Sequence, residues 1–269
     1  MFLSYLYISP HNFRMLMMRP RIILALLLRN ESLVKTVRFD EFTYVGDPCN
    51  IVRIFNELEV DELLLLDIMA TREKRLPNFN VLTDIASECF MPLGYGGGVR
   101  TLDHAKSIFD IGFEKIVVNT YAVEQPEFIS QVAKHYGSQA VIASIDVKKS
   151  FWGTDTVRIH AGKKNTHRNP VEWAVELERL GAGEILLTSI DREGTWAGFD
   201  LDLVKLVTSR VSIPVIAHGG AGSVEHIGEA IHQGGASAVA LGSMVVFQKK
   251  GMGILVNFPD EKELEAIIR

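Results

Sequence analysis

The sequence predicts an α/β fold, a single (β/α)8 TIM barrel made of two duplicated half-barrels. Three observations predict this fold: apolar runs are continuous rather than alternating, amphipathic stretches separate them, and the two halves of the 269-residue chain repeat a glycine pattern. Continuous apolar runs are typical of parallel strands that helices cover. Strand–helix units repeated along a chain of this length close into a barrel.

The first half of the chain contains four expected strands. Each is a short, continuously apolar run: Arg21–Leu28, Glu62–Asp67, Met91–Tyr95 and Lys115–Asn119. The amphipathic stretches between these runs predict helices, because a helix that covers a sheet buries one apolar face. These helices are expected at Cys49–Glu57, Phe79–Glu88 and Leu102–Ile111.

The second half of the chain repeats this alternation of apolar strands and amphipathic helices. Strands are expected at Ala140–Asp146, Glu184–Ser189, Val215–His218 and Ala238–Leu241, and helices at Pro126–His135, Pro170–Leu180 and Leu201–Val207. The polar and basic segment Ser150–Asn169 interrupts the rhythm, which predicts an excursion of the loop after the fifth strand. Such a loop is either a solvated hairpin or a segment that closes over a substrate.

The two halves share a proline followed by closely spaced glycines, and then a strand with small polar residues at its end. Gly97 corresponds to Gly220 and Thr120 to Ser243, with the same offset for both pairs. A constant offset indicates internal duplication. Glycine-rich strand ends let backbone N–H groups approach phosphate oxygens, so two such places predict a ligand with a phosphate at each end. Glycines that only permit tight turns are the alternative.

Composition limits the possible functions. The net charge of −5 gives no support for nucleic-acid binding, and no signal peptide or membrane span is expected, so the predicted location is cytoplasmic. Cys49 and Cys89 lie far apart and have no metal-ligand spacing, so neither a metal site nor a cofactor is expected. The barrel is predicted to occupy residues 18–269, preceded by a poorly ordered extension at 1–17.

Asp146 is the leading candidate for proton transfer. It ends an apolar strand, where the active sites of such barrels lie, and partial burial can bring a carboxyl pKa toward neutrality. An N-cap or a salt bridge to Lys148 or Lys149 is the alternative. Asp67 ends another strand, and for this residue ligand binding and capping are both open.

Several motifs resemble the cyclase subunit of imidazole glycerol phosphate synthase. They are Gly96–Arg100, Val118–Thr120, Ser144–Asp146, Val171–Ala174, Gly181–Arg192 and Ala217–Gly220. The resemblance implies a half-duplicated barrel that pairs with a glutaminase subunit and receives ammonia through the barrel. It further implies closure of an imidazole ring on a bis-phosphorylated substrate.

The resemblance also assigns roles to single residues. Asp146 matches one of two catalytic aspartates, and Lys35 matches a substrate-binding lysine. Positions that match phosphate contacts are Gly98, Asn119, Thr120, Gly194, Gly220, Gly242 and Ser243. Asp67 is kept as a substrate-binding candidate. Four charged residues at strand starts match a ring that admits ammonia, although a stabilising salt-bridge ring is the alternative: Arg21, Glu62, Lys115 and Glu184.

Leu27 stands where the resemblance predicts the second catalytic aspartate. A leucine neither donates nor accepts a proton, and losing one member of an acid–base pair costs about 10²–10⁴ in rate. Two further departures are Glu193 in place of an aspartate and His218 in place of a serine. Tyr121 is bulkier than the alanine usual at its position.

The runs Leu26–Leu28 and Leu33–Phe39 resemble a divergent, glycosyl-amidation-associated branch of that family. The branch is thought to help convert a sugar N-acetyl group to an acetamidino group, with a glutaminase and a separate sugar amidotransferase. We therefore favour an ammonia-conducting subunit in surface-polysaccharide biosynthesis, bound to a glutaminase as a heterodimer. The alternatives are an authentic cyclase of histidine biosynthesis and the related sugar-phosphate isomerase, and Leu27 counts against both.

Overall fold

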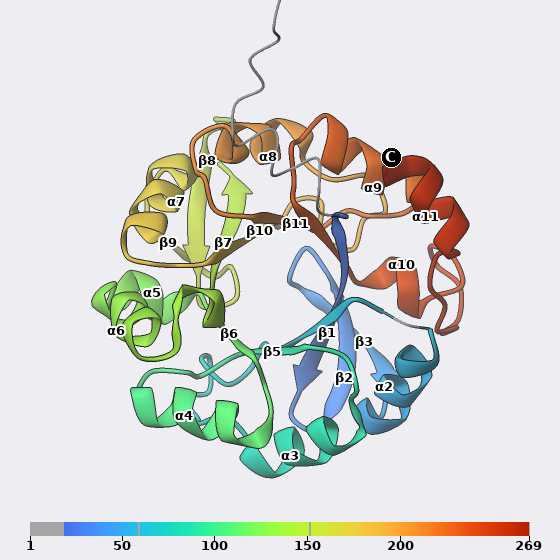
Figure 1. Ribbon diagram of the computed structural model, residues 1–269. Helices are drawn as coiled ribbons and strands as arrows, with labels where there is room; N and C mark the ends of the chain where they lie inside the picture. Colours follow the sequence, from blue (N-terminus) through green and yellow to red (C-terminus); the bar gives the residue numbers. More distant parts are fainter. Residues whose placement is uncertain (1–18, 59, 151, 269) are drawn as a thin grey trace, which may run out of the picture.

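The computed structural model describes residues 19–268 apart from positions 59 and 151. The predicted extension at 1–17 lies outside these residues. Eight parallel strands of the described chain close into a barrel, as predicted (Figure 1). In barrel order they are β1 (Arg21–Arg29), β4 (Glu62–Asp67), β5 (Leu93–Gly96), β6 (Lys115–Val118), β7 (Val141–Lys149), β10 (Glu184–Ser189), β11 (Val215–His218) and β12 (Ala238–Leu241).

Helices surround the barrel in Figure 1 and bury the outer face of its strands. They are α2 (Pro48–Glu57), α3 (Phe79–Glu88), α4 (Leu102–Ile111), α5 (Thr120–Glu124), α6 (Glu127–Tyr136), α7 (Pro170–Arg179), α8 (Leu201–Thr208), α9 (Val224–His232), α10 (Ser243–Val246) and α11 (Glu261–Ile268), with the 3₁₀ turn η1 (Ser138–Ala140). Side-chain caps and prolines help to determine where these helices begin. Before α7, the Asn169 side chain accepts the N–H groups of Val171 and Glu172, and Pro170 occupies the first turn.

The inside of the barrel is an apolar core. Side chains alternate between the two faces of each strand, so every second residue points inward. The inward-facing cluster consists of Ile23, Ala25, Leu64, Val117, Ile142, Leu186, Ile216, Ala238 and Ala240, with Leu66 packed against it. These small and branched side chains separate two polar ends of the barrel.

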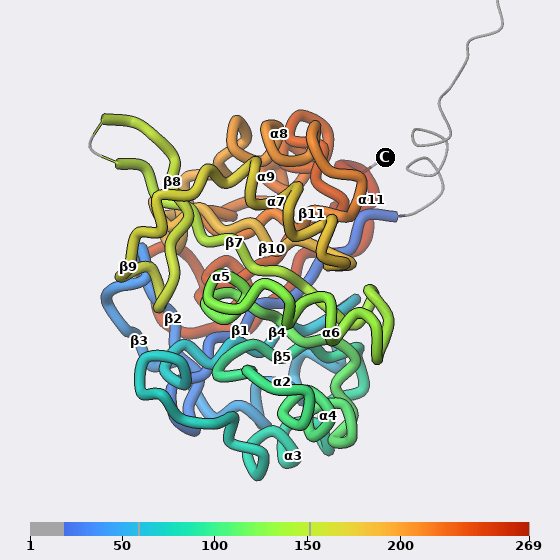
Figure 2. Tube along the Cα trace, turned by 90° about the vertical axis from the view of Figure 1, so that its left-hand side faces the viewer, coloured from blue at the N-terminus to red at the C-terminus, as the bar shows by residue number. Residues whose placement is uncertain are grey.

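The structure contains two antiparallel hairpins whose strands the sequence pattern did not predict. One consists of β2 (Ser32–Val37) and β3 (Glu41–Gly46) after β1, and the other adds β8 (Asp155–Ile159) and β9 (Lys164–Asn165) to β7. The second confirms the predicted excursion after the fifth strand. Both extend from the side of the molecule opposite the start of β1 (Figure 2).

The two hairpins touch each other. Lys163 Nζ lies 3.7 Å from a carboxylate oxygen of Asp40, and the Phe39 ring lies against Gly162. The Arg38 N–H donates to the Glu193 carbonyl at 3.0 Å, which anchors the first hairpin to the loop after β10. The hairpins therefore cover the carboxyl ends of the barrel strands. Within the described chain, no helix is long and apolar enough to cross a bilayer.

Candidate active site

A cavity of about 330 Å³ opens at the carboxyl ends of the strands. Its floor comes from the barrel and its walls from both hairpins. The predicted residues that it brings together are Asp67, Gly98, Asn119, Thr120 and Asp146. A much smaller cavity of about 20 Å³ lies beside it and collects Lys35, Gly194, Gly220, Gly242 and Ser243. Leu27 and His218 line both cavities, so they form the wall between them.

Asp146 is buried on β7 and lines the larger cavity. Burial raises the pKa of its carboxyl to about 7, with the negative charge of Glu193 acting in the same direction. Hydrogen bonds from Thr188 and Ser144 oppose this rise because they stabilise the ionised form. Neither Lys148 nor Lys149 pairs with Asp146, and Lys149 instead lies 3.5 Å from Asp200. The carboxyl thus has a pKa suited to a group that gains and loses a proton near neutral pH.

Replacing Asp146 by asparagine is expected to stabilise the protein at alkaline pH. The folded state holds the proton more tightly than the unfolded chain, so ionisation costs stability as pH rises from about 4 to about 7. Above pH 7 the variant should gain up to about 4 kcal/mol in free energy of unfolding. Denaturant titrations at pH 4.5 and 8.5 would measure this. An equal gain at both pH values would contradict the assigned cause.

The larger cavity contains one of the two predicted phosphate sites. Gly97 and Gly98 have φ angles of 130° and 71°, conformations that L side chains rarely adopt. The Asn119 side chain donates to the Ser144 carbonyl at 3.1 Å, and the Thr120 hydroxyl accepts the His160 N–H at 3.0 Å. These contacts fix the two side chains at the cavity edge and tie α5 to the second hairpin.

The Asp67 carboxylate makes contacts within the turn that follows β4. One of its carboxylate oxygens accepts the N–H groups of Met69 and Ala70, both at 3.0 Å, and the Arg75 guanidinium lies 2.8 Å from the other. These contacts close the turn after β4. Because Asp67 also lines the cavity, ligand binding remains a prediction alongside its turn-forming role.

The smaller cavity contains the second predicted phosphate site. Lys35 is buried on β2, and burial lowers its pKa to about 8 despite attraction by Glu193. Its ammonium group donates to the Ala25 carbonyl. A Cβ at Gly220 would lie 2.2 Å from the Gly198 carbonyl oxygen, so only glycine fits the approach of these two loops. A lysine beside closely approaching backbone is suited to binding an anion.

Leu27 lies at the position where a second acid was expected. It is 7% exposed and lies next to Leu66 of β4 in the strand register. Thus the side of the cavity formed by β1 is apolar, while Asp146 on β7 supplies a carboxyl. The ends of these two strands therefore differ in chemistry, with an apolar side chain in the first half of the barrel and a carboxyl in the second.

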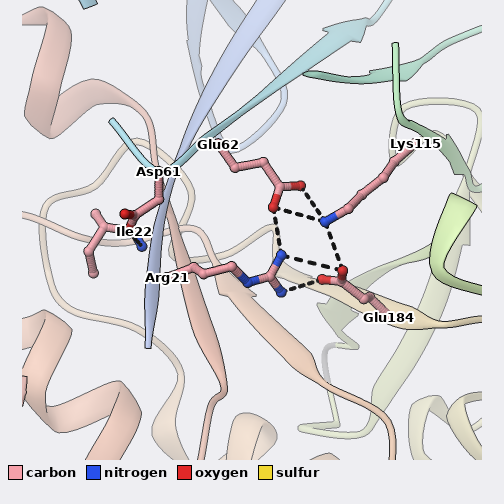
Figure 3. Close-up of polar contacts among 6 residues, drawn as sticks. All are labelled: Arg21, Ile22, Asp61, Glu62, Lys115 and Glu184. Atoms are coloured by element: carbon pink, nitrogen blue, oxygen red, sulfur yellow. Dashed lines mark hydrogen bonds and ion pairs between the residues drawn. The ribbon is translucent and has the colours of Figure 1, made fainter. Parts of the chain in front are cut away.

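The four charged residues predicted at the barrel base form one closed ring. Arg21 contacts Glu62 at 2.6 Å and Glu184 at 2.5 Å, while Lys115 lies 2.8 Å from each of the same carboxylates (Figure 3). Burial works against ionisation of Glu184, but Arg21 and Lys115 outweigh it and lower the pKa of that carboxyl. The basic and acidic side chains alternate around the ring, so each carboxylate contacts both cations.

Comparison with known proteins places this geometry in a family. The profile of the "Histidine biosynthesis protein" family matches residues 21–250, which span all eight barrel strands and both cavities. The chain belongs to the histidine biosynthesis protein family. The site residues named above all lie inside the matched region.

Relatives in the histidine biosynthesis protein family cover almost the whole chain. The chain is similar to two proteins named "Putative imidazole glycerol phosphate synthase subunit", hisF2 of Pseudomonas aeruginosa and HisF of Leptospira borgpetersenii. They are 49% and 44% identical, and each alignment covers 93% of this chain and 99% of the relative. The imidazole glycerol phosphate synthase subunit HisF of Chlorobium luteolum is 42% identical over 87% of this chain and 92% of its own length.

Sequence reasoning did not assign a role to several residues of the site. Thr188 and Ser144 contact Asp146, and His160 and Phe39 line the larger cavity from the hairpins. The inward period-two pattern of β7 and β10 could have identified Ser144 and Thr188. The hairpin residues had no comparable signal, because their position depends on how the two loops fold over the barrel.

Proposed function

We propose that this protein is the barrel subunit of a glutamine amidotransferase complex. It binds a glutaminase at the base of the barrel, as a heterodimer, and passes ammonia to the cavity at the opposite end. The observation that carries the proposal is the charged ring of Arg21, Glu62, Lys115 and Glu184 below an interior lined by apolar residues. An interior without charged groups leaves ammonia unprotonated and excludes water from the transfer.

We further propose that the ammonia serves amidation of a sugar, giving an acetamidino group during surface-polysaccharide biosynthesis, with a separate sugar amidotransferase as the final acceptor enzyme. Leu27 supports this destination, because the cavity lacks an acid on the β1 side where ring closure would need one. In this proposal Asp146 and the glycine loops bind or position a phosphorylated ligand.

An isotope experiment tests the destination of the ammonia. The purified protein, its glutaminase and the sugar amidotransferase are supplied with glutamine carrying ¹⁵N in the side-chain amide and with an N-acetyl sugar. The expected product carries ¹⁵N in its acetamidino group, and omitting the barrel subunit abolishes the label. Efficient incorporation into the imidazole ring of a bis-phosphorylated cyclase substrate would overturn the proposal.

The second candidate function is authentic imidazole glycerol phosphate synthesis, a lyase reaction of histidine biosynthesis. The two cavities support it, because Lys35 lines one and Thr120 lines the other, each together with closely spaced glycines. Asp146, with its pKa near 7, supplies one of the two proton-transfer groups that ring closure requires.

Both candidate functions predict that Lys35 binds an anionic ligand. Replacement by methionine, which keeps most of the side-chain volume, should weaken binding of a bis-phosphorylated ligand by about tenfold to a hundredfold, since a charge-assisted hydrogen bond contributes about 1.5–3 kcal/mol. Isothermal titration would measure the affinity. The matched control is Lys163→Met, which changes a lysine of the hairpin outside both cavities. Equal affinities for all three proteins would remove Lys35 from the site.

A further inference from the structure

A histidine, a threonine and an aspartate occupy neighbouring strands at the floor of the larger cavity. Thr188 of β10 is the register partner of Asp146 on β7 and also of His218 on β11. Register partners on adjacent parallel strands point to the same face. The three side chains therefore form a row across the inside of the barrel, and all three line the cavity.

Thr188 lies between the two titratable groups of this row. The Thr188 hydroxyl lies 3.0 Å from His218 Nδ1. Thr188 is also opposite Asp146 in the strand register, where it favours the ionised form of that carboxyl. Nδ1 is thus occupied, while Nε2 of His218 has no hydrogen-bond partner among the described residues. A hydroxyl donates one hydrogen bond and accepts others, so Thr188 can pass a proton between the two groups.

We propose that His218, Thr188 and Asp146 form a proton-transfer chain, in which His218 exchanges a proton with the bound ligand and Thr188 transmits it to Asp146. This places a second proton-accepting group in the cavity, on β11 of the same half-barrel as Asp146 and beside Leu27 in the wall between the two cavities. The identity of the ligand rests on the proposed function, whereas the arrangement of the three side chains does not.

The transfer balances without charging the imidazole. In the starting state Asp146 is ionised, Thr188 donates to it, and His218 carries its proton on Nδ1. When Nε2 accepts a proton from the ligand, the Nδ1 proton moves to the Thr188 oxygen and the Thr188 proton moves to Asp146. The ligand has lost one proton, Asp146 is neutral, and His218 is again neutral with its proton on Nε2.

The surroundings favour this neutral exchange. Burial, together with the charge of Lys35, lowers the pKa of His218 to about 3, so an imidazolium is strongly disfavoured. Asp146 has a pKa of about 7 and can hold the transferred proton. The other charged groups near the row are Glu193, which lines the smaller cavity with His218, and Arg158, the register partner of Asp146 on β8.

Nuclear magnetic resonance of the full chain labelled with ¹⁵N-histidine tests the proposal without any ligand. The chain has eight histidines, and the resonances of His218 are those lost in His218→Gln. Between pH 5.5 and 8.5 His218 should stay neutral but change from the Nε2–H to the Nδ1–H tautomer, with a midpoint near pH 7. The tautomer should change because an ionised Asp146 requires Thr188 to donate to it. The Thr188 oxygen then accepts from His218, which must carry its proton on Nδ1.

Matched variants test whether Thr188 couples the tautomer of His218 to the ionisation of Asp146. Thr188→Val removes the hydroxyl at nearly constant volume and should abolish the tautomer change, and Thr188→Ser should retain it. Asp146→Asn should also abolish it, which keeps the test available if the valine variant does not fold. A single tautomer at every pH in the unmodified protein, or a change that survives Asp146→Asn, would overturn the proposal.

A kinetic measurement tests whether His218 exchanges a proton with a bound ligand. With the bis-phosphorylated cyclase substrate and ammonium, or with the sugar-amidation system, His218→Gln should lower kcat at least tenfold while KM stays within about twofold. A lowered kcat/KM that arises from KM alone would assign His218 to binding and overturn its proton-transfer role. If neither system turns over with the unmodified protein, the proposed function fails, while the tautomer experiment still decides the proton-transfer chain.

Discussion

Leu27→Asp is expected to increase cyclisation of the bis-phosphorylated substrate by about 10²–10⁴, the usual contribution of one positioned acid–base group. Leu27 lines both cavities, so a carboxylate there would face the same ligand as Asp146 from the other half of the barrel. The unmodified protein should cyclise this substrate slowly when ammonium replaces glutamine. Steady-state rates for the two proteins at saturating ammonium would measure the difference.

Leu27→Asn is the matched control, because it has nearly the volume and polarity of aspartate without its ionisable proton. It should remain close to the unmodified protein in rate. Near-normal cyclisation by the unmodified protein would overturn the amidation proposal and establish the lyase function. A rise in rate that asparagine also produces would show that polarity, not proton transfer, limits the reaction.

Lys115→Glu is expected to uncouple glutamine hydrolysis from product formation. Lys115 contacts Glu62 and Glu184 at 2.8 Å, so the substitution would place three carboxylates around the single cation Arg21. Breaking a buried ion pair by removing one partner typically costs about 3–5 kcal/mol. The ring should open, and ammonia should escape to solvent instead of entering the barrel.

The ratio of glutamine hydrolysed to product formed measures this uncoupling. Lys115→Met is the milder variant, because it removes the charge without adding another. The double variant Glu62→Lys, Lys115→Glu exchanges the two signs and keeps the ring neutral, so it should recover part of the coupling. Coupling that stays unchanged in Lys115→Glu, in a protein with normal glutaminase affinity, would leave the ring as a stabilising ion-pair network and remove its gating role.

The barrel itself was predictable from sequence because its strands are buried on both faces. Runs such as Glu62–Asp67 and Glu184–Ser189 have a continuous apolar centre with polar residues only toward their ends, and the structure places both strands at these bounds. The hairpin formed by β2 and β3 gave no such signal. Most of β3 is exposed and mixes polar with aromatic residues, so its pattern does not distinguish a strand from a loop.

The site was predictable to a similar extent. Residues at strand ends, such as Asp146 and Thr120, could be assigned to one face because parallel strands end at the same side of the barrel. The row formed by Asp146, Thr188 and His218 could not, because it depends on the register between neighbouring strands. The turn contacts of Asp67 also depend on the loop after β4, where Arg75 folds back to the carboxylate.

The two half-barrels contribute unequally to the charged ring at the barrel base. Three of its residues, Arg21, Glu62 and Lys115, belong to the first half-barrel, and Glu184 alone comes from the second. Two copies of the first half would meet with an excess of positive charge, and two copies of the second with only carboxylates. Only unlike halves neutralise each other at this position. The charge balance of the ring therefore depends on two unlike halves being joined in a single polypeptide.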